Sequence, residues 1–100
     1  MTEQRKYHRV PVDLSVTCLL GEEEFEGSVK DLSVGGMFIE CETQPPFASK
    51  LILLIPGISA RELRIPAVVR WAEPRGFGVQ FGLLGGYATH AIVDLVKKRS

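Results

Sequence analysis

Apolar and polar residues alternate strictly near the start of the chain, and this pattern constrains the fold more than any other. The apolar members are Val12, Leu14, Val16, Cys18 and Leu20. Polar residues stand between the first four of them. Because successive side chains of a strand point to opposite sides, a period of two predicts a strand over residues 12–20 with one buried face.

Similar apolar patterns predict further strands along most of the chain. They cover residues 25–32, 37–41, 51–55, 63–72 and 77–81. Glycine, proline and acidic residues separate them, and such residues favour turns. The glycine pair at 35–36 predicts a bulge, a bend or a close approach to the backbone. Strands at this near-hairpin spacing favour an antiparallel barrel or a sandwich.

The apolar period changes to three and four near the C-terminus. The apolar positions are Leu84, Ala88, Ala91, Ile92, Leu95 and Val96. This spacing predicts one amphipathic helix over residues 85–99, packed on the strands. Basic residues at 97–99 suit the negative end of a helix dipole. The expected fold class is therefore all-β with one C-terminal helix.

Length and composition indicate one ordinary globular domain. The chain has 100 residues, of which 45% are hydrophobic and 24% charged, which argues against disorder. No apolar run approaches the ~20 residues that a membrane span needs. The polar first nine residues lack the apolar centre of a signal peptide. We expect a cytoplasmic protein without membrane insertion and without an attached output domain.

The distribution of charge narrows the classes of function. A net charge of zero argues against a general DNA or RNA binder. It does not argue against a small anionic ligand, because Arg5, Lys6, His8 and Arg9 crowd the first ten residues.

Catalytic and metal-binding patterns are missing from the sequence. It contains no nucleophile, phosphate-loop or zinc-protease motif. Its two histidines, His8 and His90, do not fall beside cysteines or carboxylates at metal-ligand spacing. Cys18 and Cys41 lack a paired spacing and alternate with apolar residues, so we expect them to be reduced core residues. The sequence therefore predicts neither an enzyme nor a metal or cofactor site.

Two short motifs remain as candidates for a ligand site. The first is the pair Arg5 and Arg9, four residues apart and just before the first strand. The second is the segment Asp31-Leu32-Ser33-Val34-Gly35-Gly36. Alone, the first is also typical of a solvated tail, and the second of ordinary turn chemistry.

Together, and in this order, the two motifs resemble the signature of the PilZ family, which is RxxxR followed by [D/N]xSxxG. The matching positions are Arg5, Arg9, Asp31, Ser33 and Gly36. Segments 68–71 and 76–81 also resemble the late strands of that family, so the resemblance covers nearly the whole chain. It implies a six-stranded antiparallel β-barrel over residues 12–82, followed by the helix over 85–99. It also implies a mobile ligand-binding segment over residues 1–11.

The resemblance implies cyclic di-GMP as the ligand. The planar fork of arginine can bond a guanine edge, stack on a base and pair with a phosphate. We therefore expect Arg5 and Arg9 to close over the ligand as the N-terminal segment becomes ordered.

The resemblance also implies roles for the residues of the second motif. Asp31 is expected to accept hydrogen bonds from a guanine edge or to hold an arginine in place. Ser33 is expected to offer its hydroxyl to a phosphate or a base edge. On a strand these two side chains would point to the same face. Gly35 and Gly36 are expected to let the ligand approach the backbone.

Weaker candidates surround these positions. Lys6, His8 and Arg70 are secondary candidates for ligand contact, and a solvated surface position is the alternative for each. Trp71 is predicted to be a core residue, because it alternates with Val69 and Ala67.

For the function, the resemblance implies a stand-alone adaptor. It would pass ligand binding to an unidentified effector protein that controls motility, pili or exopolysaccharide. One alternative is a ligand-independent PilZ-type protein-interaction module. A small barrel that binds oligonucleotides is a second alternative, disfavoured because most aromatics fall on the apolar side of the alternation.

Overall fold

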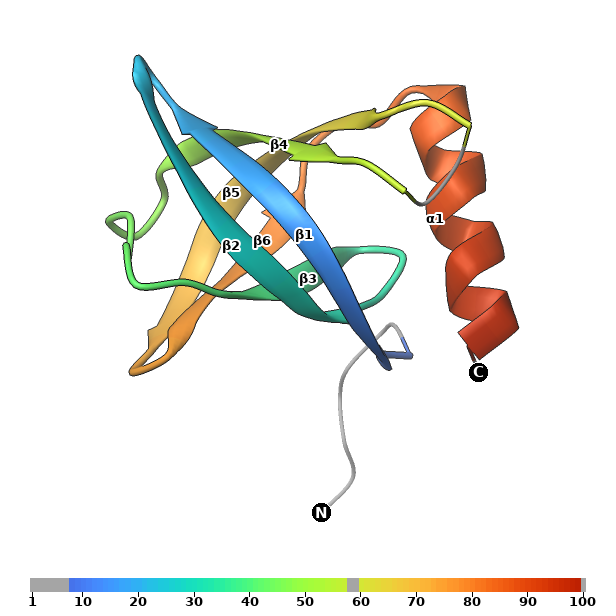
Figure 1. Cartoon of the computed structure of the whole chain (residues 1–100), viewed down its shortest axis with the longest axis horizontal. Helices are drawn as coiled ribbons and strands as arrows, with labels where there is room; N and C mark the ends of the chain where they lie inside the picture. The colour runs from blue at the N-terminus through green and yellow to red at the C-terminus, as the bar shows by residue number, and fades with distance from the viewer. Residues whose placement is uncertain (1–7, 58–59, 100) are drawn as a thin grey trace.

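Strands form a closed barrel, and one helix follows them (Figure 1). The computed structural model describes residues 8–57 and 60–99. The elements in these residues are β1 (Val10–Leu20), β2 (Glu23–Leu32), β3 (Gly36–Glu40), β4 (Lys50–Ile55), β5 (Leu63–Glu73), β6 (Gly76–Phe81) and α1 (Gly86–Arg99). The strand order around the barrel is β1-β2-β3-β6-β5-β4, with every pair antiparallel. The predicted barrel with a C-terminal helix is confirmed.

The barrel begins earlier in the chain than the alternation predicted. β1 starts at Val10 rather than at residue 12, because Val10 pairs with Leu32 of β2 and is buried. Residues 10 and 11 therefore belong to the barrel wall and not to a separate N-terminal segment. Of the segment before β1, only His8 and Arg9 lie in the described part of the chain.

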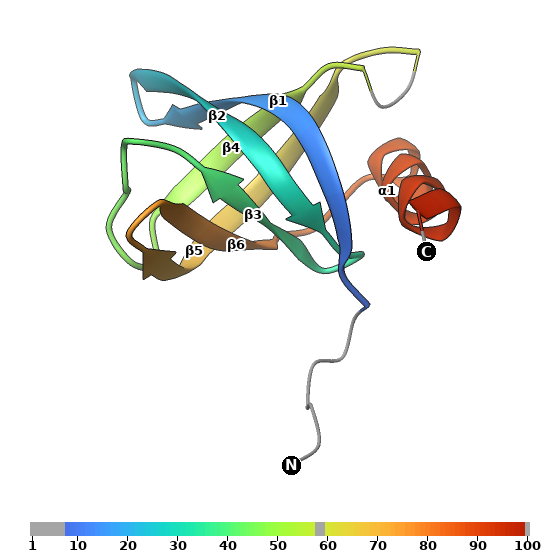
Figure 2. The same ribbon diagram turned by 60° about the horizontal axis from the view of Figure 1, so that its bottom comes forward.

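The core is built from the inward-facing residues of all six strands and from one face of α1. Ala88, Ile92 and Val96 recur every four residues on that face, and all three are buried. The helix contacts β1 and β5, and Figures 1 and 2 both show it beside the barrel. Within the described residues, no helix has the length and apolar character needed to cross a membrane.

The two cysteines differ in their environments, although both are free thiols. Cys18 on β1 is fully buried, as predicted. The prediction of burial was wrong for Cys41, which follows the last residue of β3 and is only partly buried. Its Sγ donates to the carbonyl oxygen of Glu26 at 3.2 Å.

β-Bulges interrupt the regular register of three strands. The register shifts lie between Pro11 and Leu14 of β1, Val29 and Asp31 of β2, and Val69 and Trp71 of β5. A bulge inserts an extra residue and bends the strand, so two consecutive side chains can face the same side. These irregularities change which side chains face out of the barrel.

Candidate functional site

Arg9 and Asp31, one from each of the two sequence motifs, form an ion pair on the outside of the barrel. The Nη1 atom of Arg9 donates to Oδ1 of Asp31 on β2. The Cζ atom of Arg9 also lies 5.2 Å from the centre of the Trp71 ring on β5. The side chains of Arg9 and Asp31 are 20% and 37% exposed. The guanidinium is thus held between a carboxylate and an aromatic face, at a position that solvent reaches.

These residues lie in a hollow of about 700 Å³, which we call the arginine hollow. Its lining residues are Arg9, Val10, Pro11, Lys30, Asp31, Phe38, Trp71 and Glu73. The volume falls within the range of about 300–1,000 Å³ that is typical of small-molecule sites. The lining combines two cations, two carboxylates and two aromatic rings, which suits a ligand with both charged and planar parts.

Trp71 lines the arginine hollow, so the prediction that it is a core residue was wrong. The bulge between Val69 and Trp71 breaks the alternation, and Val69 is buried while the next two side chains stay outside. Trp71 pairs with Gly78 of β6. A Cβ atom at Gly78 would lie 2.0 Å from Cε2 and Cζ2 of the indole, so the missing side chain makes room for the ring. The indole Nε1 donates to Oε2 of Glu73 at 3.2 Å.

Ser33 does not share a face with Asp31, contrary to the expectation. β2 ends at Leu32, so Ser33 begins the turn between β2 and β3, where it is buried. Its Oγ accepts from the backbone N–H groups of Gly35 and Gly36, each at 3.1 Å, and donates to the Gly36 carbonyl oxygen at 3.3 Å. The hydroxyl therefore shapes the turn that follows Asp31.

Gly36 is required by packing within the barrel. A Cβ atom at this position would lie 2.2 Å from the carbonyl oxygen of Val79 on β6. The carbonyl oxygen of its neighbour Gly35 accepts from the N–H of Phe81 at 2.9 Å. The glycine pair thus joins the β2–β3 turn to β6, whereas the sequence suggested an approach of ligand to backbone.

A family model decides the classification. The model of the PilZ domain matches residues 3–97. The chain belongs to the PilZ family. No curated protein sequence matches it.

Solved structures share the fold of this PilZ domain. The PilZ domain of YcgR from Escherichia coli with c-di-GMP has a TM-score of 0.79 and 12% sequence identity, over 97% of this chain and 92% of that chain. The PilZ domain of CeSA from a cellulose-synthesizing bacterium has a TM-score of 0.73 and 19% identity, over 91% and 96%. The Bacillus subtilis inhibitor of motility MotI/DgrA has a TM-score of 0.81 and 21% identity. The match covers 98% of this chain but only 52% of MotI, so the chain spans about half of that protein.

Two other sequence candidates, Arg70 and His8, are described by the structure and do not line the arginine hollow. Arg70 is exposed, and its Nε donates to Oε1 of Gln80 at 2.9 Å. His8 is exposed just before Arg9 and does not line the hollow. Arg5 and Lys6 lie outside the described residues.

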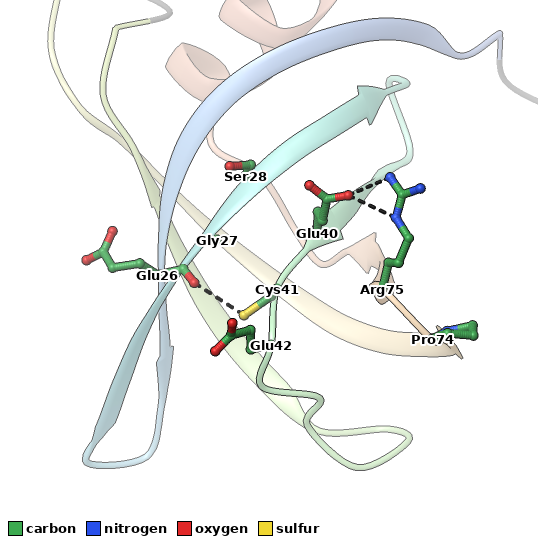
Figure 3. A pocket seen from close by; sticks show the side chains of 8 residues that line it. All are labelled: Glu26, Gly27, Ser28, Glu40, Cys41, Glu42, Pro74 and Arg75. Atoms are coloured by element: carbon green, nitrogen blue, oxygen red, sulfur yellow. Dashed lines mark hydrogen bonds and ion pairs between the residues drawn. The ribbon is translucent and has the colours of Figure 1, made fainter.

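A second hollow, of about 530 Å³, lies across β2, β3 and the β5–β6 turn (Figure 3). We call it the acidic hollow. Its lining residues are Glu26, Gly27, Ser28, Glu40, Cys41, Glu42, Pro74 and Arg75. This lining carries three carboxylates and one guanidinium, and Arg75 already donates to Oε2 of Glu40 at 2.5 and 3.0 Å. Like charges would repel an anionic ligand here, so the arginine hollow is the better candidate site.

The sequence interpretation missed Lys30, Phe38 and Glu73 as lining residues of the hollow. No motif marks them, and their shared position depends on bulges and on pairing between distant strands. Within the described residues, no cluster of histidine, cysteine or acidic side chains is arranged to hold a metal ion.

Proposed function

We propose that this PilZ domain is a receptor for cyclic di-GMP and binds it in the arginine hollow. The observation that carries the proposal is that Arg9, Asp31 and Trp71 meet in one hollow on the barrel wall. The relatives support the choice of ligand, because the PilZ domain of YcgR was solved with c-di-GMP.

The chemistry of the hollow matches the two parts of this ligand. Cyclic di-GMP has two phosphates within a closed ring and two guanines attached to that ring. Trp71 and Phe38 offer aromatic faces for a base, and such stacking stabilises binding by about 1–3 kcal/mol per base. The Arg9 guanidinium can bond a guanine edge or a phosphate, and Asp31 orients it.

The other motif residues have supporting parts in this proposal. Ser33, Gly35 and Gly36 fix the turn that follows Asp31, and so hold the carboxylate in place. Arg5 precedes β1 with Arg9, and we propose that it adds a second guanidinium to the bound ligand. We propose no ligand contact for His8 or Arg70, because neither lines the arginine hollow, and we keep Lys6 as a secondary candidate on the basis of the sequence.

For the output, we propose that ligand binding alters contact with an effector protein. The ligand joins the segment before β1 to strands β2, β3 and β5, so binding would change the surface at this part of the wall. Control of motility, pili or exopolysaccharide then follows from which partner binds. The relative MotI is an inhibitor of motility, which makes motility the first process to examine.

Isothermal titration calorimetry with cyclic di-GMP tests the receptor proposal. We expect wild type to bind and Arg9→Ala to lose affinity about ten- to a hundredfold, because a charge-assisted contact of about 1.5–3 kcal/mol is lost. Arg64→Ala is the matched control. Arg64 is an exposed arginine of the same barrel, about 23 Å along β5 from Trp71 by strand rise. Folded wild type without binding would instead favour the ligand-independent interaction module.

A further inference from the structure

We propose that Lys30 is a further ligand-binding residue of the arginine hollow, and that its ammonium group binds a phosphate oxygen. To reach the phosphate, the ammonium group leaves the carboxylate of Asp13, its present partner. This inference rests on the proposed function, because it names a contact within the same site.

The β2 bulge is what brings Lys30 to the hollow. Val29 and Leu32 are both fully buried although they are three residues apart, which a regular strand with a period of two does not allow. The bulge between Val29 and Asp31 supplies the extra residue. Lys30 and Asp31 therefore both face outward, and both line the hollow.

The balance of charge in the described lining favours a contribution from Lys30 beside the two arginines. Arg9 and Lys30 are the cations of its described lining, and Asp31 and Glu73 are the anions, so these charges cancel. The charge of Arg9 is already paired with Asp31. A ligand with two phosphates therefore favours a cation that can leave its carboxylate, and Lys30 is the one whose partner lies outside the hollow lining.

The present contacts of Lys30 are of a kind that exchanges readily. Its Nζ lies 3.1 Å from Oδ1 of Asp13 and 4.0 Å from Oε1 of Glu40. The Asp13 side chain is 80% exposed, and an ion pair in such contact with water contributes little. The lysine stem is flexible and its ammonium has three rotatable donors. Water can solvate Asp13 once Lys30 has turned to the phosphate, so Asp13 acts as a competitor of the ligand.

Two variants with opposite expected effects test this role, each titrated with cyclic di-GMP by calorimetry. Lys30→Gln removes the cation, and we expect affinity to fall about tenfold or more because a charge-assisted bond is lost. Asp13→Asn removes the competitor and is expected to tighten binding. Lys50→Gln is the matched control, because it removes one positive charge at an exposed residue outside the hollow lining and should leave affinity unchanged.

Two further measurements of affinity distinguish phosphate binding by Lys30 from a structural role. Lys30→Arg keeps the charge and should retain most of the wild-type affinity. Added salt should weaken wild type more steeply than Lys30→Gln, because the variant has one charge fewer to screen.

The results distinguish this inference from the proposed function. If wild type binds but Lys30→Gln binds equally well, the role of Lys30 is overturned while the receptor proposal stands. If Asp13→Asn weakens binding as much as Lys30→Gln, the pair only braces β1 against β2, and the inference is again overturned. If wild type does not bind, both proposals are overturned.

Discussion

Ser33 uses its hydrogen-bonding capacity inside the β2–β3 turn. Its hydroxyl accepts from two backbone N–H groups and donates to one carbonyl oxygen, and the side chain is buried. A serine hydroxyl offers one donor and two acceptor positions, so none is left for a ligand in this arrangement. Ser33 thus supports the site indirectly, because it fixes the turn that follows Asp31.

Ser33→Ala should therefore act on stability. The variant removes the side-chain acceptor of the buried Gly36 N–H and of the partly buried Gly35 N–H, and we expect the free energy of unfolding to fall by about 1–3 kcal/mol. Urea denaturation followed by circular dichroism measures this change. Ser15→Ala, at an exposed position of β1, is the control and should stay within about 0.5 kcal/mol. An unchanged stability for Ser33→Ala would contradict the turn-shaping role.

Gly36→Ala tests the packing between β3 and β6. The added Cβ would meet the Val79 carbonyl oxygen at 2.2 Å, so the strands must separate locally. We expect a loss of at least about 1–3 kcal/mol in the free energy of unfolding, as for other overpacked sites.

Gly82→Ala is the matched control for that variant. A Cβ at Gly82 meets its nearest atom at 3.5 Å, which is ordinary contact. Equal melting temperatures for Gly36→Ala and Gly82→Ala would show that the close approach at Gly36 does not limit stability.

At the scale of elements, the strands were predictable and the bulges were not. Alternation along β1 and β5 indicated the strands correctly, because one face of each is buried. Nothing in the sequence marked the extra residues of β2 and β5, since a bulge depends on how neighbouring strands pair. For this reason the alternation predicts a core position for Trp71 and gives no signal for Lys30.

The outward position of Trp71 leads to a prediction for ligand binding. Trp71→Ala should weaken the binding of cyclic di-GMP by about 1–3 kcal/mol, which is the usual contribution of one stacked base. Calorimetry measures the effect. Arg70→Gln is the neighbouring control, because Arg70 bonds Gln80 and does not line the hollow. If Arg70→Gln lost affinity and Trp71→Ala did not, the placement of the ligand over Trp71 would be wrong.

At the scale of the whole molecule, the buried thiol of Cys18 makes the free energy of unfolding depend on pH in the alkaline range. Burial first, and then the neighbouring Cys41 and Glu26, raise the pKa of Cys18 from 9.0 to about 12. Between these values the folded chain keeps the proton and the unfolded chain releases it. The stabilisation is therefore fully present below pH 9 and is lost as pH rises toward 12.

Comparison of wild type with Cys18→Ala isolates this effect. From pH 8 to pH 10, wild type should lose about 1.4 kcal/mol more of its free energy of unfolding than the variant. Urea titrations at both pH values measure the difference, and other titrating groups cancel between the two proteins. Parallel losses in the two proteins would mean that Cys18 ionises in the folded state as easily as in the unfolded state.

The fold followed largely from the sequence, whereas the assembly of the candidate site depends on the tertiary structure. The barrel class and the C-terminal helix followed from periodicity together with the family resemblance. Arg9 and Asp31 were named from motifs, but their ion pair depends on how β1 and β2 pair. Phe38, Trp71 and Glu73 come from strands that are distant in sequence. Their meeting depends on β6, which pairs with both β3 and β5, and no local pattern encodes it.

The central claim is that cyclic di-GMP binds on the barrel wall between Arg9, Asp31 and Trp71. The most direct test is a titration followed by two-dimensional ¹H–¹⁵N NMR spectroscopy. Trp71 is the single tryptophan of the chain, so its indole N–H gives one separate signal. We predict that this signal and the backbone amide signals of Asp31 and Phe38 shift. The amide signal of Gly27, in the acidic hollow, should not shift. Shifts centred on the acidic hollow, with the Trp71 signal unmoved, would contradict the account.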